Sequence, residues 1–131
     1  MESLIFDTTF LIDFQRERTG NSSGGAHEFL EAHADAGAYL PVTAYGEFAE
    51  GFTNRMDRAF LSVVESFELL PVTRTVADAY AAIVRKLRAR GRLIGTNDLW
   101  IAATAVDKNW PLVTRNTAEF ARVAGLQLRS Y

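Results

Sequence analysis

The chain of 131 residues has the length of one domain, and its 48% hydrophobic and 23% charged residues are typical of a globular protein. It contains no cysteine, which excludes disulfides, thiolate nucleophiles and cysteine-based zinc sites. The formal net charge of −2 argues mildly against a nucleic-acid-binding protein, although a bound divalent cation supplies positive charge locally. The N-terminus has no long apolar segment, and the longest apolar run, 79–84, is too short to span a membrane. We therefore expect a cytoplasmic protein with a single domain over residues 1–131 and no membrane contact.

Short apolar runs alternate with amphipathic segments along the whole chain. In the first half of the chain we expect a strand at 3–6, a helix at 8–15, a loop at 20–25, a helix at 26–36, a strand at 39–42 and a helix that Thr43 caps and that carries Glu47. In the second half we expect a helix at 56–66, a strand at 68–72, helices at 75–90 and 97–106, a strand at 111–114, a short helix at 117–123 and a last strand at 126–129. The helix at 75–90 is the clearest, because its apolar residues recur three and four positions apart and Gly91 follows as a terminator.

This alternation predicts an α/β domain with a mostly parallel sheet that helices cover on both faces. In such sheets, ligands and substrates bind beyond the carboxyl ends of the strands. The polar residues that follow the predicted strands are therefore the candidates for a functional site.

Acidic and amide side chains cluster near the ends of the predicted strands. Asp7 directly follows the first strand, and Glu47 lies one helical turn beyond the second. Asp98 opens the helix before the fourth strand, and Asn116 and Glu119 come just after that strand. Crowded carboxylates repel each other unless a cation joins them. A ligand set of oxygen atoms suits Mg²⁺, or alternatively Mn²⁺, and such an ion activates water and shields a phosphodiester under attack.

Each of these residues also has a purely structural interpretation. Asp7 is a favoured residue for capping the helix that follows it. Glu47 alone fits a solvated helix residue, and Asp98 fits a residue that complements a helix dipole. Asn116 and Glu119 have the spacing of a capping box, in which the glutamate bonds back to the helix start. Only the joint placement of these residues at one edge of the sheet favours a metal site.

Four segments of the sequence resemble, in order and rough spacing, the VapC-like PIN domains, which are ribonuclease toxins of toxin–antitoxin pairs. They are DTTFLIDF at 7–14, TAYGEFAEG at 43–51, GTNDLWIAATA at 95–105 and LVTRNTAEF at 112–120. In that family, the acidic site consists of the first Asp, the Glu of the E-x-x-x-G stretch and the Asp before I-A-A-x-A. These positions correspond to Asp7, Glu47 (with Gly51) and Asp98. The resemblance implies a three-layer α/β/α fold, Mg²⁺-dependent cleavage of RNA, a cognate antitoxin and a homodimer.

The sequence departs from the family at one position. Many PIN domains carry a fourth carboxylate after the fourth strand, where this chain has Asn116, with Glu119 three residues further on. An asparagine can coordinate an ion through its carbonyl oxygen, but it contributes no charge. The residue that takes the fourth position, and the presence of a second metal ion, therefore stay open.

Four further residues are candidates for supporting roles. Thr8, Thr96 and Thr114 lie next to the acidic residues in sequence, where they either orient water or phosphate or simply cap helices. Arg115 is the candidate for contacting the RNA backbone. It is preferred to the basic cluster at 85–92, because cations are generally favoured at a helix C-terminus.

The leading hypothesis is a metal-dependent endoribonuclease toxin with Asp7, Glu47, Asp98 and Asn116 as its catalytic residues. The alternative is a PIN-fold binding module that has lost catalysis and acts through antitoxin or nucleic-acid contact alone. A third hypothesis is a DNA-directed nuclease or a trafficking-type PIN protein that pairs with a DNA-binding chain, since a fold does not determine a substrate.

Overall fold

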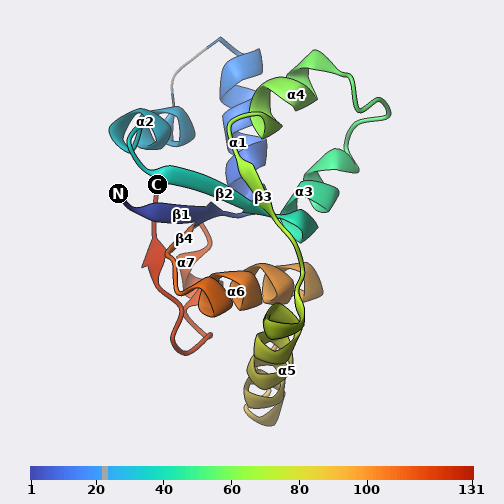
Figure 1. Cartoon of the computed structure of the whole chain (residues 1–131), viewed down its shortest axis with the longest axis vertical. Coiled ribbons are helices and arrows are strands. Elements are labelled where there is room, and N and C mark those ends of the chain that lie inside the picture. The colour runs from blue at the N-terminus through green and yellow to red at the C-terminus, as the bar shows by residue number, and fades with distance from the viewer. Residues whose placement is uncertain (22–23) are drawn as a thin grey trace.

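The computed structural model, which describes residues 1–21 and 24–131, shows a parallel sheet between two layers of helices (Figure 1). The strands are β1 (Ser3–Phe6), β2 (Gly37–Pro41), β3 (Glu68–Leu70), β4 (Leu112–Val113) and β5 (Leu128–Arg129). The helices are α1 (Thr8–Thr19), α2 (Gly25–Ala32), α3 (Val42–Ala49), α4 (Arg58–Val64), α5 (Arg74–Ala89), α6 (Thr96–Lys108) and α7 (Thr117–Phe120). The expected three-layer α/β/α fold is confirmed.

The strand order β3-β2-β1-β4-β5 places the first strand in the middle of the sheet. All four pairings are parallel. Figure 1 shows α1, α2 and α4 on one side of the sheet and α5, α6 and α7 on the other. The chain builds the sheet outward from β1 in both directions, so the carboxyl ends of β1 and β4 flank the point where ligands bind in open parallel sheets.

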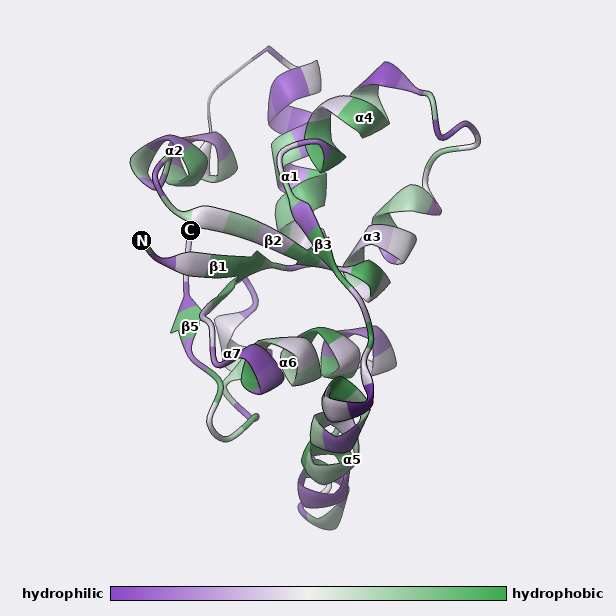
Figure 2. Cartoon of the chain, viewed as in Figure 1, coloured by the Kyte–Doolittle hydropathy of each residue, from purple (hydrophilic) through white to green (hydrophobic). Residues whose placement is uncertain are grey.

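The centre of the sheet is the most deeply buried part of the chain. Leu4, Ile5 and Phe6 of β1 are at most 1% exposed, as expected for a strand that helices cover on both faces. The ring of Phe10 on α1 lies 4.6 Å from that of Phe6, measured between centroids. Figure 2 shows hydrophobic colour along β1 and on the turns of α1 nearest the sheet, with hydrophilic turns farther away. The residues that directly follow β1 are therefore attached to a tightly packed part of the core.

Several predicted boundaries are off by up to one helical turn. The helix expected at 26–36 ends at Ala32, because His33 leaves the helical conformation and its ring stacks on Phe29. The N–H of Ala36 then closes a turn by donating to the carbonyl of His33. The strands expected at 39–42, 68–72, 111–114 and 126–129 are shifted or shortened, to the bounds given above for β2 to β5.

The predicted helix cap at Thr43 is wrong, and the loop predicted at 20–25 lies only partly within the described residues. Thr43 does not cap a helix, because α3 begins at Val42 directly after Pro41. Of the loop expected at 20–25, residues 22 and 23 lie outside the described residues, and α2 already begins at Gly25.

Within the described ranges, no helix is both long and apolar enough to cross a membrane.

Candidate active site

Asp7 and Thr114 lie together at the carboxyl ends of two neighbouring strands. Phe6 of β1 is in register with Val113 of β4, and Asp7 and Thr114 are the residues that follow them. The Thr114 hydroxyl donates a hydrogen bond of 2.6 Å to Asp7 Oδ2, and the backbone N–H of Phe10 donates one of 2.9 Å to Oδ1. Asp7 therefore caps α1, as its structural interpretation predicts. Its second oxygen, however, is fixed by a residue 107 positions away, which capping does not require.

The Asp7 carboxyl group is buried away from solvent. The residue is only 2% exposed, and this burial raises its pKa above the ordinary value. The hydrogen bonds from Thr114 and from the Phe10 N–H oppose the rise, whereas the charge of Asp13 adds to it. A positive charge at this position would stabilise the ionised carboxylate.

Asp98, in the first turn of α6, lies within electrostatic range of three other acidic side chains. Burial raises its pKa to about 6, and the charges of Asp7, Glu47 and Glu119 add to the effect. A helix dipole acting alone would stabilise the ionised carboxylate and lower its pKa, so the dipole interpretation does not account for this shift. The structure thus brings together carboxylates from the end of β1 and from α3, α6 and α7.

Glu47 is exposed on α3, yet its carboxylate is held in place. Asn97 Nδ2 donates a hydrogen bond of 2.7 Å to Glu47 Oε1 and so ties α3 to the first turn of α6. The sequence analysis did not single out Asn97. Its place directly before Asp98, within the segment GTND, is the signal that could have found it.

Asn116 and Glu119 occupy different parts of the site. Within residues 1–21 and 24–131, the Asn116 side chain makes no capping hydrogen bond to α7, so the capping-box interpretation is not supported. The Asn116 N–H instead donates a bond of 3.0 Å to Thr114 Oγ1, which anchors this residue beside Asp7. Glu119 is exposed, and its charge acts on Asp98. Glu119 therefore brings charge to the site, and Asn116 brings a neutral carboxamide.

The predicted supporting residues Thr8 and Thr96 differ in their surroundings. The Thr8 hydroxyl is buried, and it has no hydrogen-bond partner among the residues that the structure describes. Such orphaned groups are uncommon in folded proteins, so a bound group at this edge would satisfy it. Thr96 is exposed as the first residue of α6, where Gly95 is the N-cap.

The residues at this edge fit a hard divalent cation by their chemistry. Their donors are carboxylate, hydroxyl and carboxamide oxygens, the ligands that Mg²⁺ prefers. A bound cation would relieve the repulsion that the neighbouring acids exert on Asp98, and the Thr8 hydroxyl has no partner within residues 1–21 and 24–131. As the side chains stand, no group of three or more acids or histidines in the described part of the chain is arranged to hold an ion. The fit therefore lies in the chemistry of the donor atoms and in their charge, not in a ligand set already arranged around an ion.

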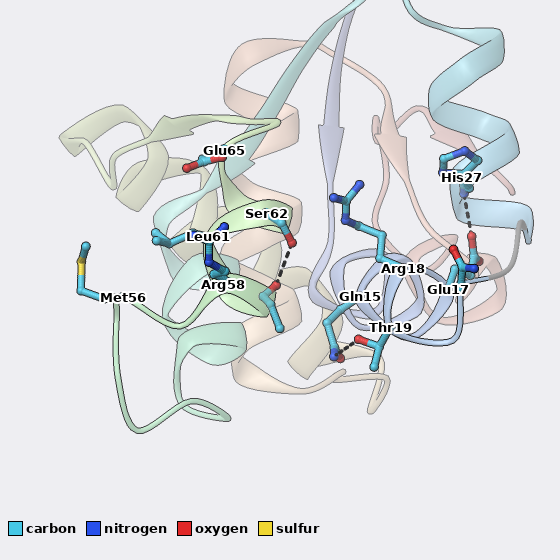
Figure 3. A pocket seen from close by; sticks show the side chains of 12 residues that line it. Gln15, Glu17, Arg18, Thr19, His27, Met56, Arg58, Leu61, Ser62 and Glu65 are labelled. Atoms are coloured by element: carbon cyan, nitrogen blue, oxygen red, sulfur yellow. Dashed lines mark hydrogen bonds between the residues drawn. The ribbon is translucent and has the colours of Figure 1, made fainter.

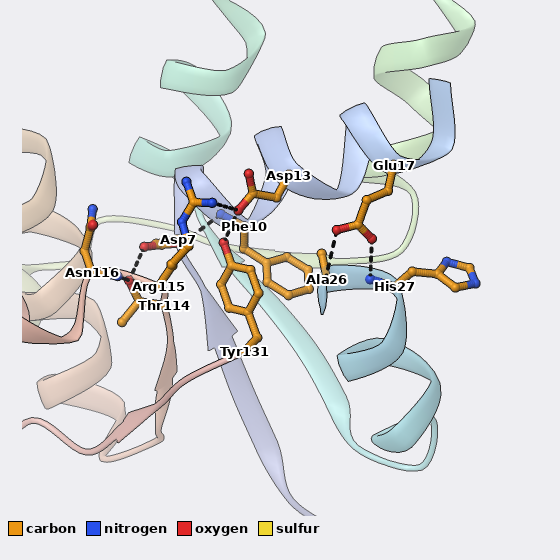
Figure 4. Close-up of polar contacts among 10 residues, drawn as sticks. All are labelled: Asp7, Phe10, Asp13, Glu17, Ala26, His27, Thr114, Arg115, Asn116 and Tyr131. Carbon is orange, nitrogen blue, oxygen red and sulfur yellow. Dashed lines mark hydrogen bonds and ion pairs between the residues drawn. The ribbon is translucent and has the colours of Figure 1, made fainter. Parts of the chain in front are cut away.

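Arg115 lies at the same edge and pairs with an acid that the sequence analysis missed. Its Nη1 is 3.3 Å from Asp13 Oδ2, and the Tyr131 hydroxyl donates a bond of 2.7 Å to the same oxygen (Figure 4). Asp13 belongs to the segment DTTFLIDF, but no local pattern connects it with residues near the other end of the chain.

A separate hollow lies between α1 and α4 (Figure 3). Its volume is about 900 Å³, and its lining includes Arg18, Met56, Arg58, Leu61 and Glu65. Among the described residues, the acidic side chains at the strand ends do not line it. The hollow is thus a second surface, distinct from the candidate active site, with both apolar and charged groups.

The fold and this acidic edge of the sheet define a PIN domain. The sequence model of that family, described as "PIN domain", matches residues 4–126, and the chain belongs to this family. Within the family it is similar to ribonucleases named VapC, as the resemblance of its motifs predicted.

Two relatives and one solved structure illustrate this similarity. Ribonuclease VapC1 of Methanocaldococcus jannaschii is 32% identical over 129 residues, which cover 98% of this chain and 86% of the relative. Ribonuclease VapC of Rickettsia bellii is 30% identical over 133 residues, which cover 95% and 93%. The structure of VapBC2 from Rickettsia felis bound to a DNA fragment from its promoter aligns with a TM-score of 0.86 at 21% identity, covering 98% of both chains.

Proposed function

We propose that this protein is a metal-dependent endoribonuclease and the toxin of a toxin–antitoxin pair. The observation that carries the proposal is the placement of the partly buried Asp98 within range of the charges of Asp7, Glu47 and Glu119, in a chain whose relatives are named ribonucleases. Burial, together with those charges, raises the pKa of Asp98 to about 6. Crowded carboxylates repel one another when they are ionised, and a divalent ion relieves that repulsion.

In this mechanism, Asp7, Glu47 and Asp98 would hold Mg²⁺, or alternatively Mn²⁺. A divalent ion there would supply activation of water and positive charge beside the phosphodiester. Thr114 fixes the orientation of Asp7 through its hydroxyl, and Asn97 fixes that of Glu47 through its amide. The chain thus holds two of its three proposed ligands in place by hydrogen bonds from neighbouring elements.

The remaining site residues complete the proposal. The Asn116 carboxamide, anchored beside Asp7, offers a neutral oxygen, and Glu119 adds negative charge within range of Asp98. The Thr8 hydroxyl, which has no partner in the part of the chain that the structure describes, donates to a water or a phosphate oxygen. Thr96, exposed at the start of α6, meets the substrate side of the site.

We expect the purified protein to cut RNA in the presence of Mg²⁺ or Mn²⁺. Cutting should stop when EDTA is added and should return when Mg²⁺ is then added in excess. End-labelled single-stranded RNA reports the cleavage, and duplex DNA tests the DNA-directed alternative. Asp98→Asn should remove most of the cutting, whereas Asp107→Asn, which removes a charge at the other end of α6, should cut like wild type. Cutting that persists in EDTA would overturn the metal requirement. RNA binding without cutting under any metal would favour the inactive binding module.

We also propose a protein antitoxin as the partner. The similar solved structures include a toxin–antitoxin complex from Klebsiella pneumoniae and a member of the VapBC family of toxin–antitoxin systems from Mycobacterium tuberculosis. The hollow between α1 and α4 offers apolar and charged contacts for an antitoxin segment. An arginine of such a segment would pair with Asp7, Glu47 and Asp98, because a guanidinium matches carboxylates geometrically.

Co-expression with the adjacent reading frame is expected to restore growth that the chain alone inhibits, and to yield a stable complex. A cytoplasmic location follows from this role. The mass of the complex by light scattering also tests the proposed homodimer, for which the exposed Val42, Leu69 and Val72, in or near the edge strand β3, provide apolar surface. If no neighbouring product binds or neutralises the protein, the toxin role is wrong.

A further inference from the structure

Three side chains distant in sequence form a connected polar group beside the acidic site. The Tyr131 hydroxyl donates to Asp13 Oδ2 at 2.7 Å, and Arg115 Nη1 lies 3.3 Å from the same oxygen (Figure 4). The ring of Tyr131 packs edge-on against Phe10, with 4.8 Å between ring centroids. Asp13 is thus held from two sides, by a packed hydroxyl and by a guanidinium.

This group is attached to the candidate active site at both ends. Asp13 is on α1, the helix that Asp7 caps, and Arg115 directly follows Thr114, which donates to Asp7. The charges agree with this closeness, since Asp13 contributes to the raised pKa of Asp7. Tyr131 has a raised pKa because of burial and its bond to Asp13, with a smaller contribution from Asp7. Arg115 therefore lies beside the acidic side chains at the strand ends, and we call this position the rim of the site.

Fold stability alone does not account for this arrangement. The Arg115 side chain is 59% exposed, and an ion pair so exposed contributes at most about 1 kcal/mol. Its pairing with Asp13 uses Nη1, which leaves other N–H donors of the guanidinium fork available. The carboxylate that Arg115 pairs with is that of Asp13, whose side chain is only 13% exposed. Asp13 therefore holds the Arg115 guanidinium at the rim, and the pairing leaves the other N–H donors of the guanidinium available.

We propose that Arg115 binds a phosphate of the RNA at the rim of the acidic site, and that Asp13 and Tyr131 are positioning residues that hold its guanidinium there. The inference rests on the proposed ribonuclease function, which it deepens. A guanidinium fork matches phosphate oxygens in two parallel hydrogen bonds. Such a contact fixes the register of the RNA without reading its sequence.

The affinity of single-stranded RNA, measured by fluorescence anisotropy in EDTA across a salt titration, tests the contact without cleavage. Arg115→Gln should weaken binding about 10- to 100-fold, the worth of hydrogen bonds to a charged group. The slope of log affinity against log salt should fall by about 0.7, as expected for one lost phosphate contact on a single strand. Arg115→Lys should keep the slope and lose part of the affinity, because it keeps the charge but not the fork.

Asp13→Asn and Tyr131→Phe test the positioning roles. Tyr131→Phe keeps the ring on Phe10 and removes only the hydroxyl, so it should weaken RNA binding roughly 2- to 10-fold, the worth of one hydrogen bond. In an Arg115→Gln background, neither substitution should weaken binding further, because both act through the arginine. Equal losses in both backgrounds would show a general structural effect and overturn the positioning roles.

Kinetics with Mg²⁺ separate this inference from the proposed function. In a protein that cuts RNA, Arg115→Gln should raise KM and leave kcat nearly unchanged, since the contact exists before and during cleavage. Arg90→Gln, at the far end of α5, removes the same charge and should change neither constant. Normal cutting with unchanged KM, RNA affinity and salt slope in Arg115→Gln would overturn the phosphate contact alone. Absence of cutting in wild type would overturn the ribonuclease function, while the anisotropy result still decides the contact.

Discussion

Replacing Asp7 by asparagine should slow RNA cleavage about 100- to 1,000-fold and leave the fold intact. The loss corresponds to the few kcal/mol that a bound metal ion contributes to the transition state, at 1.4 kcal/mol for each factor of ten. The fold should survive because asparagine keeps one oxygen to accept the Phe10 N–H and is as good an N-cap as aspartate. The comparison is made by single-turnover rates in Mg²⁺ together with thermal melting.

The matched control for this substitution is Asp57→Asn. Asp57 also caps a helix, by accepting the N–H of Ala59 at 2.8 Å, but it lies at the start of α4. It should cut RNA like wild type. Thr114→Val, which removes the hydroxyl that fixes Asp7, should lose about 10- to 100-fold, the usual effect of losing a residue that orients a metal ligand. If Asp7→Asn cuts at the wild-type rate, Asp7 is a helix cap and nothing more.

The placement of Asp7 shows how much of the site the sequence could predict. A buried run followed by a polar residue indicates a strand end, and parallel strands bring their carboxyl ends to one edge. This reasoning correctly placed Asp7 next to the segment that follows β4. Asp98 could be placed in the first turn of its helix because an amphipathic repeat follows it. These residues are predictable because short-range patterns determine the elements that carry them.

Contacts between side chains of different elements could not be predicted in the same way. The bond from Asn97 to Glu47 joins residues 50 positions apart, and the one from Tyr131 to Asp13 joins residues 118 apart. Spacing along the chain carries no information about such pairs, which depend on how helices pack around the sheet. The spacing of Asn116 and Glu119 suggested a capping box for the same reason, since local sequence does not reveal a competing bond to Thr114.

Asp98→Asn should stabilise the protein in EDTA at neutral pH, which is unusual for the loss of a partly buried polar group. In the folded state the pKa of Asp98 is about 6, above its ordinary value of 3.8, so between these values the folded state binds more protons than the unfolded state. The stabilisation from proton binding is complete below about pH 4 and is lost as the pH rises through 6. Asparagine carries no charge and avoids this loss.

The size of the effect follows from the shift and from the exposure of the group. A shift of this size would correspond to about 3 kcal/mol for a fully buried acid, and solvent screening at the half-exposed Asp98 reduces it to the order of 1 kcal/mol. In EDTA at pH 7.5, Asp98→Asn should therefore melt roughly 3 to 5 °C above wild type. This gap should close as the pH is lowered to about 4, where the wild-type carboxyl is protonated.

Added Mg²⁺ should reverse the order of the two proteins at neutral pH. An ion that binds only the folded state stabilises wild type by about 2.7 kcal/mol at one hundred times its Kd, whereas Asp98→Asn should gain little. Asp107→Asn, on the same helix, should follow wild type in both conditions. A helix-dipole role predicts the opposite pattern, with Asp98→Asn less stable in EDTA and showing the full response to Mg²⁺. Thermal melts of the three proteins across a Mg²⁺ titration distinguish the two, and the opposite pattern would remove Asp98 from the metal site.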